Sequence, residues 1–379
     1  MRPRLWTAVL AMALLAAAAL AATPAPAMET AARHAIIVDF DTGAVLLQKD
    51  ADVPTEPASM SKLMTVYVVF QELRAGRLHM DDMLPVSEKA WRTGGSKTFV
   101  EVGKKVSVSD LLHGVIVQSG NDACIVLAEA IAGSEEAFAD LMNRRAQELG
   151  LTHSHFTNAT GLPDPNHLMS VRDLAVLARH IITDFPEDYP LFAQTEFTFN
   201  GIRQENRNPL LADGADGLKT GHTEAAGYSL TASAARDGRR VIMVLQGLDS
   251  VQQRAEEGRR LLDWAFRAFE NVTLAKAGQA VEEAPVWLGQ RDTVPMVLGR
   301  DLVVTVPRGA TANGMHAVAT FQGPVPAPVR AGQALGRLTI SFDDGTSVEA
   351  PLYAGADVGE VGFAGRMLKA FRYLVLAGS

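Results

Sequence analysis

Ser59 and Lys62 stand three residues apart in the stretch PASMSKLMT, where a long apolar run begins. Residues i and i+3 of a helix share one face, so a helix here would place the serine hydroxyl beside the lysine amine. A serine hydroxyl is a weak nucleophile that needs a neighbouring base, and a neutral lysine is such a base. The spacing indicates a nucleophile with its base; the alternative is a helix cap followed by an ordinary surface lysine.

A second polar cluster, Ser119-Gly120-Asn121, follows the apolar run VIVQ. In acyl transfer, Ser119 could relay a proton to the leaving amine, and Asn121 could hold a peptide amide of the substrate. The alternative is a simple turn, because Ser, Gly and Asn are favoured turn residues.

A third cluster, Lys219, Thr220, Gly221 and His222, stands at the head of the strand-like segment DGLKTGHTEAAGYSLTASA. A second cation would lower the pKa of the first lysine. Thr220 with Lys219 could bind a carboxylate, and Gly221 would let a substrate backbone lie against the strand edge. The main-chain N–H groups of Ser59 and His222 are the natural oxyanion hole. The alternative is that these four residues are simply the polar first residues of a strand.

The elements that would position these clusters are strands, then helices, then strands again. A β-hairpin is predicted from Arg33, with the turn DTG; the pattern is helical between about Ser61 and His180, including SVSDLLHGVIVQ. Strand-like segments follow Tyr189, and a last long helix ends near Asn271. Such an order predicts an α+β domain in which early and late strands complete one sheet, and it does not fit a doubly wound parallel sheet.

The three clusters, in this order, resemble the motifs of penicillin-recognising serine acyltransferases. PASMSKLMT, SGNDA, FTNATGLPDP and DGLKTGHTEAAGYSLTASA together resemble, more narrowly, the low-molecular-mass penicillin-binding proteins that are D-alanyl-D-alanine carboxypeptidases, over roughly residues 33 to 270. The resemblance implies a β-lactamase/transpeptidase-like domain, in which a helical cluster packs on an antiparallel sheet. A small all-β domain and a C-terminal amphipathic helix would follow it.

The same resemblance implies an activity and partners. The protein would remove the terminal D-alanine of peptidoglycan stem pentapeptides through an acyl-serine intermediate, without a cofactor, and β-lactams would inhibit it covalently. It implies catalytic roles for Ser59, Lys62 and Ser119, and substrate-binding roles for Asn121, Lys219 and Thr220. Gly221 and His222 are added to the substrate-binding residues by the chemical argument above. Arg254 in SVQQRAEEG is a further candidate for the substrate carboxylate, although the preceding GLDSVQQ departs from the family pattern.

Other functions compete with this one. Class A β-lactamases need a glutamate to activate water for rapid deacylation, and residues 152–183 contain none, so slow β-lactam turnover is expected. A transpeptidase or endopeptidase would use the same acyl-enzyme and stays open. A non-catalytic wall-binding or scaffold protein is the third alternative; the intact Ser59, Lys62 and Lys219 argue against it.

The composition of the chain argues against several other kinds of partner and site. With 379 residues, of which 47% are hydrophobic, the chain suggests two globular domains. Its net charge of −8 argues against a nucleic-acid partner. The nine histidines show no HExxH or comparable spacing, so no metal is expected. Cys124 is the single cysteine, which excludes an internal disulfide, and its apolar neighbours predict inert packing.

Both ends of the sequence indicate export and a membrane surface. Residues 1–27 read as a signal peptide with Ala25-Pro26-Ala27 as its cleavage site; a retained membrane anchor is the alternative. At the C-terminus, a helix would place Arg366, Lys369 and Arg372 opposite an apolar arc of Phe363, Met367, Leu368, Phe371, Leu374 and Val375.

Such a basic amphipathic helix suits the outer face of the cytoplasmic membrane, or alternatively docks on the protein's own core. The expected organisation is therefore a signal peptide at 1–27, a penicillin-binding serine peptidase domain at 28–274, a small β-sandwich domain at 275–357, and a membrane-association helix at 358–379, in a peripherally attached periplasmic protein.

Overall fold

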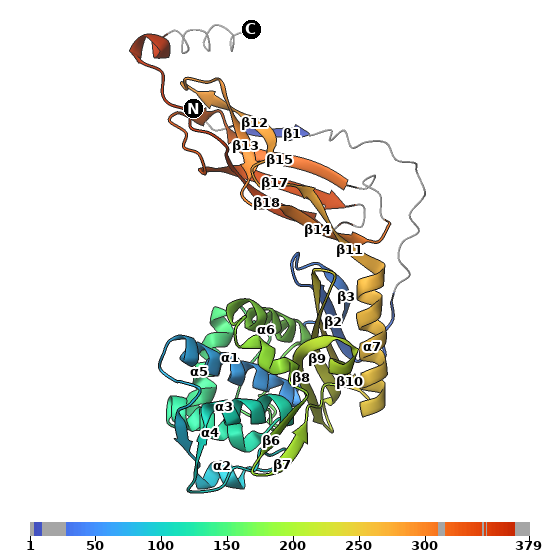
Figure 1. Ribbon diagram of the computed structural model, residues 1–379. Helices are drawn as coiled ribbons and strands as arrows, with labels where there is room; N and C mark the ends of the chain where they lie inside the picture. The colour runs from blue at the N-terminus through green and yellow to red at the C-terminus, as the bar shows by residue number, and fades with distance from the viewer. Residues whose placement is uncertain (1–3, 10–27, 310–314, 343–344, 346, 368–379) are drawn as a thin grey trace. The chain divides into compact units, whose positions relative to one another are not determined.

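The computed structural model describes residues 4–9, 28–309, 315–342, 345 and 347–367 (Figure 1). The chain forms two compact units, one of Pro26–Ala268 and one that combines Met1–Ala25 with Phe269–Ser379. All three polar clusters lie in the first of these, which has an α+β fold as predicted.

The first unit is built on a five-stranded antiparallel sheet with the strand order β3-β2-β10-β9-β8. Strands from both ends of this unit complete the one sheet, as the order of elements predicted. Strand β8 lies at one edge of this sheet and pairs with β9. The bounds are β2 (His34–Asp39), β3 (Val45–Lys49), β8 (Ala215–Thr223), β9 (Gly227–Arg236) and β10 (Arg239–Leu248).

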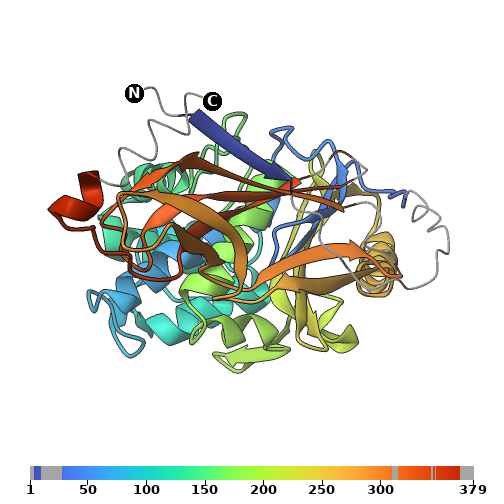
Figure 2. The ribbon, with the colours of Figure 1, turned by 90° about the horizontal axis from the view of Figure 1, so that it is seen from above.

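Helices cover both faces of this sheet. Most of them gather on one side, whereas α7 packs on β9 and β10 from the other side (Figures 1 and 2). The helices are α1 (Lys62–Arg74), α2 (Glu88–Arg92), α3 (Val108–His113), α4 (Asn121–Ala132), α5 (Glu135–Glu148), α6 (Val171–Asp184) and α7 (Val251–Ala268), with the short strands β4 (Met83–Pro85), β5 (Lys105–Ser107), β6 (Glu196–Phe199) and β7 (Ile202–Glu205) between them.

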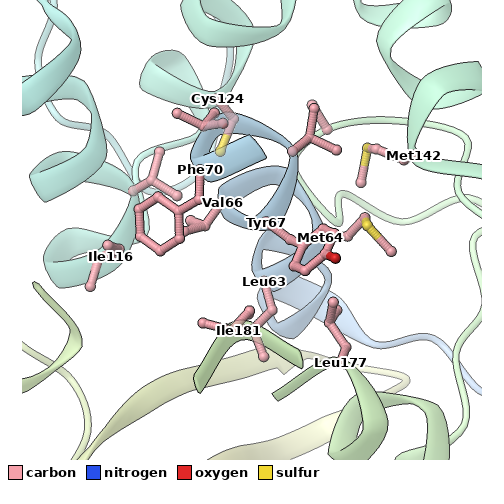
Figure 3. Close-up of a cluster of buried hydrophobic side chains, with 14 of the residues drawn as sticks. Leu63, Met64, Val66, Tyr67, Phe70, Ile116, Cys124, Met142, Leu177 and Ile181 are labelled. Atoms are coloured by element: carbon pink, nitrogen blue, oxygen red, sulfur yellow. The ribbon is translucent and has the colours of Figure 1, made fainter. Parts of the chain in front are cut away.

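Helix α1 runs through the centre of the helical layer. Its first nine residues, from Lys62 to Phe70, are all buried, because the sequence KLMTVYVVF has no polar face to give to solvent. Figure 3 shows Phe70 and Met64 among side chains of surrounding elements. Cys124 is fully buried in this core, as its apolar neighbours predicted. The lysine that begins α1 is thus carried into the interior.

The segment SVSDLLHGVIVQ, predicted as one helix, departs from an α-helix in its second half. The Ser107 hydroxyl accepts the main-chain N–H of Asp110 and starts α3, which ends at His113. A π-helical turn, Gly114–Gln118, follows, and Ser119 then adopts a left-handed conformation with φ 66°. A π turn holds one residue more than an α turn, so it changes the direction of the side chains that follow it. Periodicity alone does not reveal that change.

The second unit is all-β, as predicted. Its sheet has the order β1-β15-β17-β18-β13-β12-β16, beside the pair β11–β14. Both views show β1 along the edge of this sheet (Figures 1 and 2). The strands are β1 (Arg4–Val9), β11 (Phe269–Ala275), β12 (Ala280–Trp287), β13 (Thr293–Leu298), β14 (Leu302–Pro307), β15 (Met315–Gly323), β16 (Val325–Pro326), β17 (Ala334–Phe342) and β18 (Ser347–Ala354).

The junction between the units differs from the expected position. The last helix was expected to end near Asn271 and the β domain to begin at 275. Helix α7 instead ends at Ala268, because Phe269–Ala275 pair with β14 as strand β11. Composition changes only after this strand, so a composition shift places the boundary too late.

The two ends are described only in part. Residues 363–367 are helical, and Phe363 and Met367 are 83% and 64% exposed. The remaining positions of the predicted amphipathic helix, 368–379, and the predicted cleavage site Ala25-Pro26-Ala27 lie outside the described residues. Among the helices that the structure describes, none combines the length and the apolar character needed to cross a membrane.

Candidate active site

Ser59 and Lys62 are in direct contact. Ser59 lies in the 3-10 turn Ala58–Ser61, and Lys62 is the first residue of α1. The Lys62 Nζ donates a hydrogen bond to Ser59 Oγ at 2.8 Å and another to the main-chain oxygen of Thr160. The Lys62 side chain is fully buried. The two heteroatoms thus have the geometry of a nucleophile and its base.

Burial tunes this amine. Burial, helped by the nearby guanidinium of Arg207, lowers the pKa of Lys62 to about 8, against the opposite effects of Cys124 and Asp122. About a tenth of the amine is therefore neutral at pH 7 and about half at pH 8. A base that titrates close to neutral pH can both accept and return a proton.

Strand β8 brings the third cluster against the turn that carries Ser59. Lys219 and Thr220 are buried, and burial together with the charge of Lys62 holds the pKa of Lys219 well below its usual value. At Gly221 an added Cβ would lie 3.0 Å from the carbonyl oxygen of Pro57. The strand can approach the serine turn this closely because position 221 has no side chain.

Ser119 and Asn121 follow the π-helical turn and face the loop of residues 94–100. The Ser119 Oγ is buried and has no hydrogen-bond partner among the described residues. Asn121 donates from Nδ2 to the carbonyl of Gly94 at 2.8 Å. The adjacent Asp122 carboxylate accepts three N–H groups of residues 98–100. The second cluster and this loop are therefore one hydrogen-bonded unit.

Arg254 reaches the same region from α7. Its side chain is buried, its Nη2 donates to the carbonyl of Arg207 at 3.5 Å, and its guanidinium lies over the ring of Tyr228. The Tyr228 ring in turn packs on the exposed ring of His222, with centroids 4.0 Å apart. No described residue accepts a hydrogen bond from the Arg254 Nε. An unused donor remains at this position.

Arg207 was not predicted from the sequence. It lies in the loop between β7 and β8, donates to the Ser96 hydroxyl at 2.9 Å, and lowers the pKa values of Lys62, Lys219 and Arg254 by charge repulsion. Within the described part of the chain, none of these four cations forms an ion pair with a carboxylate. Four convergent cations that form no ion pair are suited to bind an anion.

The loop 157–162 completes the surroundings of the base. The Asn158 side-chain oxygen accepts three hydrogen bonds, from the N–H and hydroxyl of Thr160 and from the N–H of Gly161. This turn aims the Thr160 carbonyl at Lys62. A Cβ at Gly161, where φ is +74°, would lie 2.0 Å from the Ala58 carbonyl oxygen. The loop is thus packed directly against the residue that precedes the serine.

The described residues contain no group of three His, Cys, Asp or Glu side chains arranged to hold a metal ion. What they do contain is a serine hydroxyl on a buried amine, a second buried lysine, an unpartnered serine hydroxyl and an anion site. This set suits acyl transfer to serine from a substrate that carries a carboxylate.

Comparisons with known proteins agree with this chemistry. The profile of the family described as D-alanyl-D-alanine carboxypeptidase matches residues 19–250, and that of the penicillin-binding protein 5 C-terminal domain matches residues 269–360. The D-alanyl-D-alanine carboxypeptidases DacC and DacA of Escherichia coli K12 are 41% and 37% identical, over 89% and 88% of this chain and 86% and 85% of theirs. The structure of penicillin-binding protein 5 from Haemophilus influenzae has a TM-score of 0.81 at 38% identity and covers 89% of this chain and 100% of its own.

Proposed function

This chain belongs to the D-alanyl-D-alanine carboxypeptidase family, and on that premise we propose how its own residues carry out the reaction. The protein is a serine-type D-alanyl-D-alanine carboxypeptidase that removes the terminal D-alanine of peptidoglycan stem pentapeptides and is inhibited by β-lactams. The observation that carries this function is the 2.8 Å contact between Ser59 Oγ and a fully buried Lys62.

Substrate binding begins at the anion site. The terminal carboxylate of the peptide would lie between Thr220 and the cations Lys219, Arg207 and Arg254, where it supplies the missing counter-charge. The unpartnered Nε of Arg254 supports this placement, because a buried donor without an acceptor is costly unless the ligand satisfies it. The peptide backbone would run along β8, the edge strand.

Acylation follows from the Ser59–Lys62 contact. In the neutral amine the hydrogen bond reverses, so that the Ser59 hydroxyl donates to Lys62 Nζ and its oxygen attacks the carbonyl carbon between the two D-alanines. The N–H groups of Ser59 and His222 would stabilise the oxyanion. The proton that Lys62 takes from Ser59 would pass through the buried Ser119 hydroxyl to the nitrogen of the leaving D-alanine as the peptide bond breaks. Water then attacks the acyl carbonyl and gives a proton to Lys62, which returns it to Ser59 Oγ as the ester bond breaks.

The alternatives weighed from the sequence are not favoured. A transpeptidase would use the same acyl-serine but transfer it to an amine, and a non-catalytic wall-binding protein would not need a buried, pKa-lowered lysine beside a serine. The relatives over most of the chain are named carboxypeptidases. The test is mass spectrometry of a stem pentapeptide after incubation with the protein: loss of one alanine is expected, and an unchanged peptide would contradict the function.

The pH dependence of acylation should follow the titration of Lys62. Since only the neutral amine accepts the serine proton, kcat/KM should rise with pH to a plateau above about 8 and fall about tenfold per unit below 7. Arg207→Gln removes a cation that lowers this pKa, so the midpoint should move to higher pH. The midpoint of the pH profile of β-lactam acylation rates, measured from pH 5.5 to 10, reports this shift.

Arg203→Gln, at an exposed arginine paired with Glu196, is the control and should leave the midpoint unchanged. An unshifted midpoint in Arg207→Gln would contradict the electrostatic coupling of Arg207 to Lys62.

The site of action is also a proposal. The leader sequence 1–27 supports export with cleavage after Ala27, which would also remove strand β1 (Arg4–Val9) from the edge of the β-unit sheet. The basic amphipathic sequence 358–379 supports attachment to the outer face of the cytoplasmic membrane. The exposed Phe363 and Met367 in the described part of this helix are consistent with an apolar face that enters a lipid interface.

Removal of the C-terminal helix should release the protein from membranes. The cut is best made after Val361, because Gly359 and Val361 hydrogen-bond to Gln290 and Leu288 and so belong to the β unit. Flotation with anionic vesicles should show loss of binding, with unchanged kcat/KM on a soluble pentapeptide. The double variant Lys369→Glu, Arg372→Glu should weaken binding in the same direction. Continued flotation of the truncated protein would refute the anchor.

A further inference from the structure

The outer face of the β unit carries an unusual set of side chains. In β18, Leu352 and Ala354 are buried in the core, so the alternate residue Tyr353 faces away from it. Tyr353 pairs with Val297 of β13 on one side and Ala334 of β17 on the other. The solvent-facing positions of such a sheet are usually polar, and here they are tyrosine, valine and alanine.

A hollow of about 710 Å³ lies over this part of the sheet. Its size falls in the range of ligand sites in proteins, about 300–1,000 Å³. At Gly299 an added Cβ would lie 2.9 Å from the Tyr353 ring, so the glycine lets the β13–β14 loop lie against the ring edge. The residues that shape the hollow include Val297, Gly299, Arg300, Gly332, Pro351 and Tyr353.

Arg300 is the one charged residue in this lining. It is exposed and forms no ion pair with the described residues, whereas its neighbour Asp301 is engaged by Lys276 Nζ at 2.7 Å and by the N–H of Ala277. On the same face, Arg337 is paired with Glu349 at 3.0 Å. Asp301 therefore holds the β13–β14 loop in place, and the Arg300 guanidinium on this loop has no ion-pair partner among the described residues.

We propose that this hollow, the Tyr353 pocket, binds the glycan strand of peptidoglycan. The flat C–H face of a pyranose ring fits a partly exposed aromatic ring among small apolar residues, and Arg300 complements the carboxylates that this polymer carries on its peptide stems. A cation as the single charged residue disfavours a basic partner, and a purely apolar ligand would leave it without a role. The identity of the ligand rests on the proposed function, since the substrate of the enzyme is attached to this strand.

Binding of the full chain to purified sacculi tests the proposal. Cosedimentation is measured in a Ser59→Ala background, so that no substrate is consumed. Tyr353→Ala and Arg300→Glu should each weaken binding about tenfold, the scale of losing one anchor residue from an interface. Tyr353→Phe, which keeps the ring, should bind within about twofold of the parent. Arg291→Ala, at an exposed arginine in the β12–β13 turn, is the matched control and should have no effect.

A parallel assay separates this proposal from the function itself. With Ser59 intact, the same variants should release D-alanine from a soluble pentapeptide at the parental rate and should lose activity only on sacculi. Unchanged sacculus binding in both Tyr353→Ala and Arg300→Glu would overturn the proposal. So would an equal loss on the soluble peptide, which would mean that the substitutions damage the fold. Failure of every protein, parent included, on the soluble peptide would instead refute the carboxypeptidase function.

Discussion

Ser59→Ala should abolish release of D-alanine, with a fall in kcat of at least about 10⁴-fold, because it removes the oxygen that we propose forms the acyl-enzyme. The variant should still bind the pentapeptide, since Lys219, Thr220 and the arginines are untouched. It should also form no covalent adduct with a β-lactam. Mass spectrometry measures both results on one sample, as the mass of the peptide and the mass of the protein.

Ser61→Ala is the matched control for this substitution. Ser61 lies in the same short turn, is fully buried, and its Oγ has no partner among the described residues. Removing that hydroxyl should therefore leave both the fold and the adduct intact. If the Ser59 variant kept more than about a hundredth of the parental kcat, or if a β-lactam still acylated it, the nucleophile would have to be another residue.

The order of elements and the three clusters were readable in the sequence because each is a local pattern. The hairpin of β2 and β3, the capped helices and the all-β second unit all follow from periodicity and turn residues. The π-helical turn at Gly114–Gln118 and the early start of β11 could not be read from the sequence. Both depend on the elements against which these segments pack or with which they pair. Tertiary context decides such cases over local propensity.

The residues missed around the active site share one property. Arg207 stands alone in a loop, and Thr160 acts through its backbone carbonyl, which no side-chain pattern can reveal. The same holds for the depressed pKa of Lys62, which comes from complete burial at the start of an all-apolar helix and from a charge 145 positions away in the sequence. Spacing predicted that a serine and a lysine would meet; only the fold shows what lowers the pKa of that lysine.

The charge balance of the molecule sharpens this point. The chain as a whole carries a net charge of −8, yet Lys62, Lys219, Arg207 and Arg254 converge without forming an ion pair with any described carboxylate. Repulsion among buried cations costs stability and is expected only where function requires it. Here Arg207 serves twice, because it would help to hold the substrate carboxylate and its charge, together with burial, lowers the pKa of Lys62.

Lys62→Met should lower kcat/KM by about 10³-fold or more, since it removes the proposed base from beside Ser59. Methionine matches the length of the lysine side chain and suits a fully buried position, so the protein should remain folded, with one unpaired carbonyl at Thr160 as the cost. Neither D-alanine release nor β-lactam acylation should survive. Lys104→Met, at an exposed lysine, is the control for loss of a lysine as such.

A second variant distinguishes the role of Lys62 as a proton acceptor from its role as a positive charge. Lys62→Arg keeps a cation near Ser59 but cannot give up its proton, because the pKa of a guanidinium lies above about 12. If Lys62 acts as the base, the arginine variant should be as inactive as the methionine variant, and raising the pH to 10 should rescue neither. Substantial activity in Lys62→Arg, together with none in Lys62→Met, would show that Lys62 serves only as a positive charge. The proton of Ser59 would then have to go elsewhere, with the Ser119 hydroxyl and the Lys219 amine as the remaining buried acceptors.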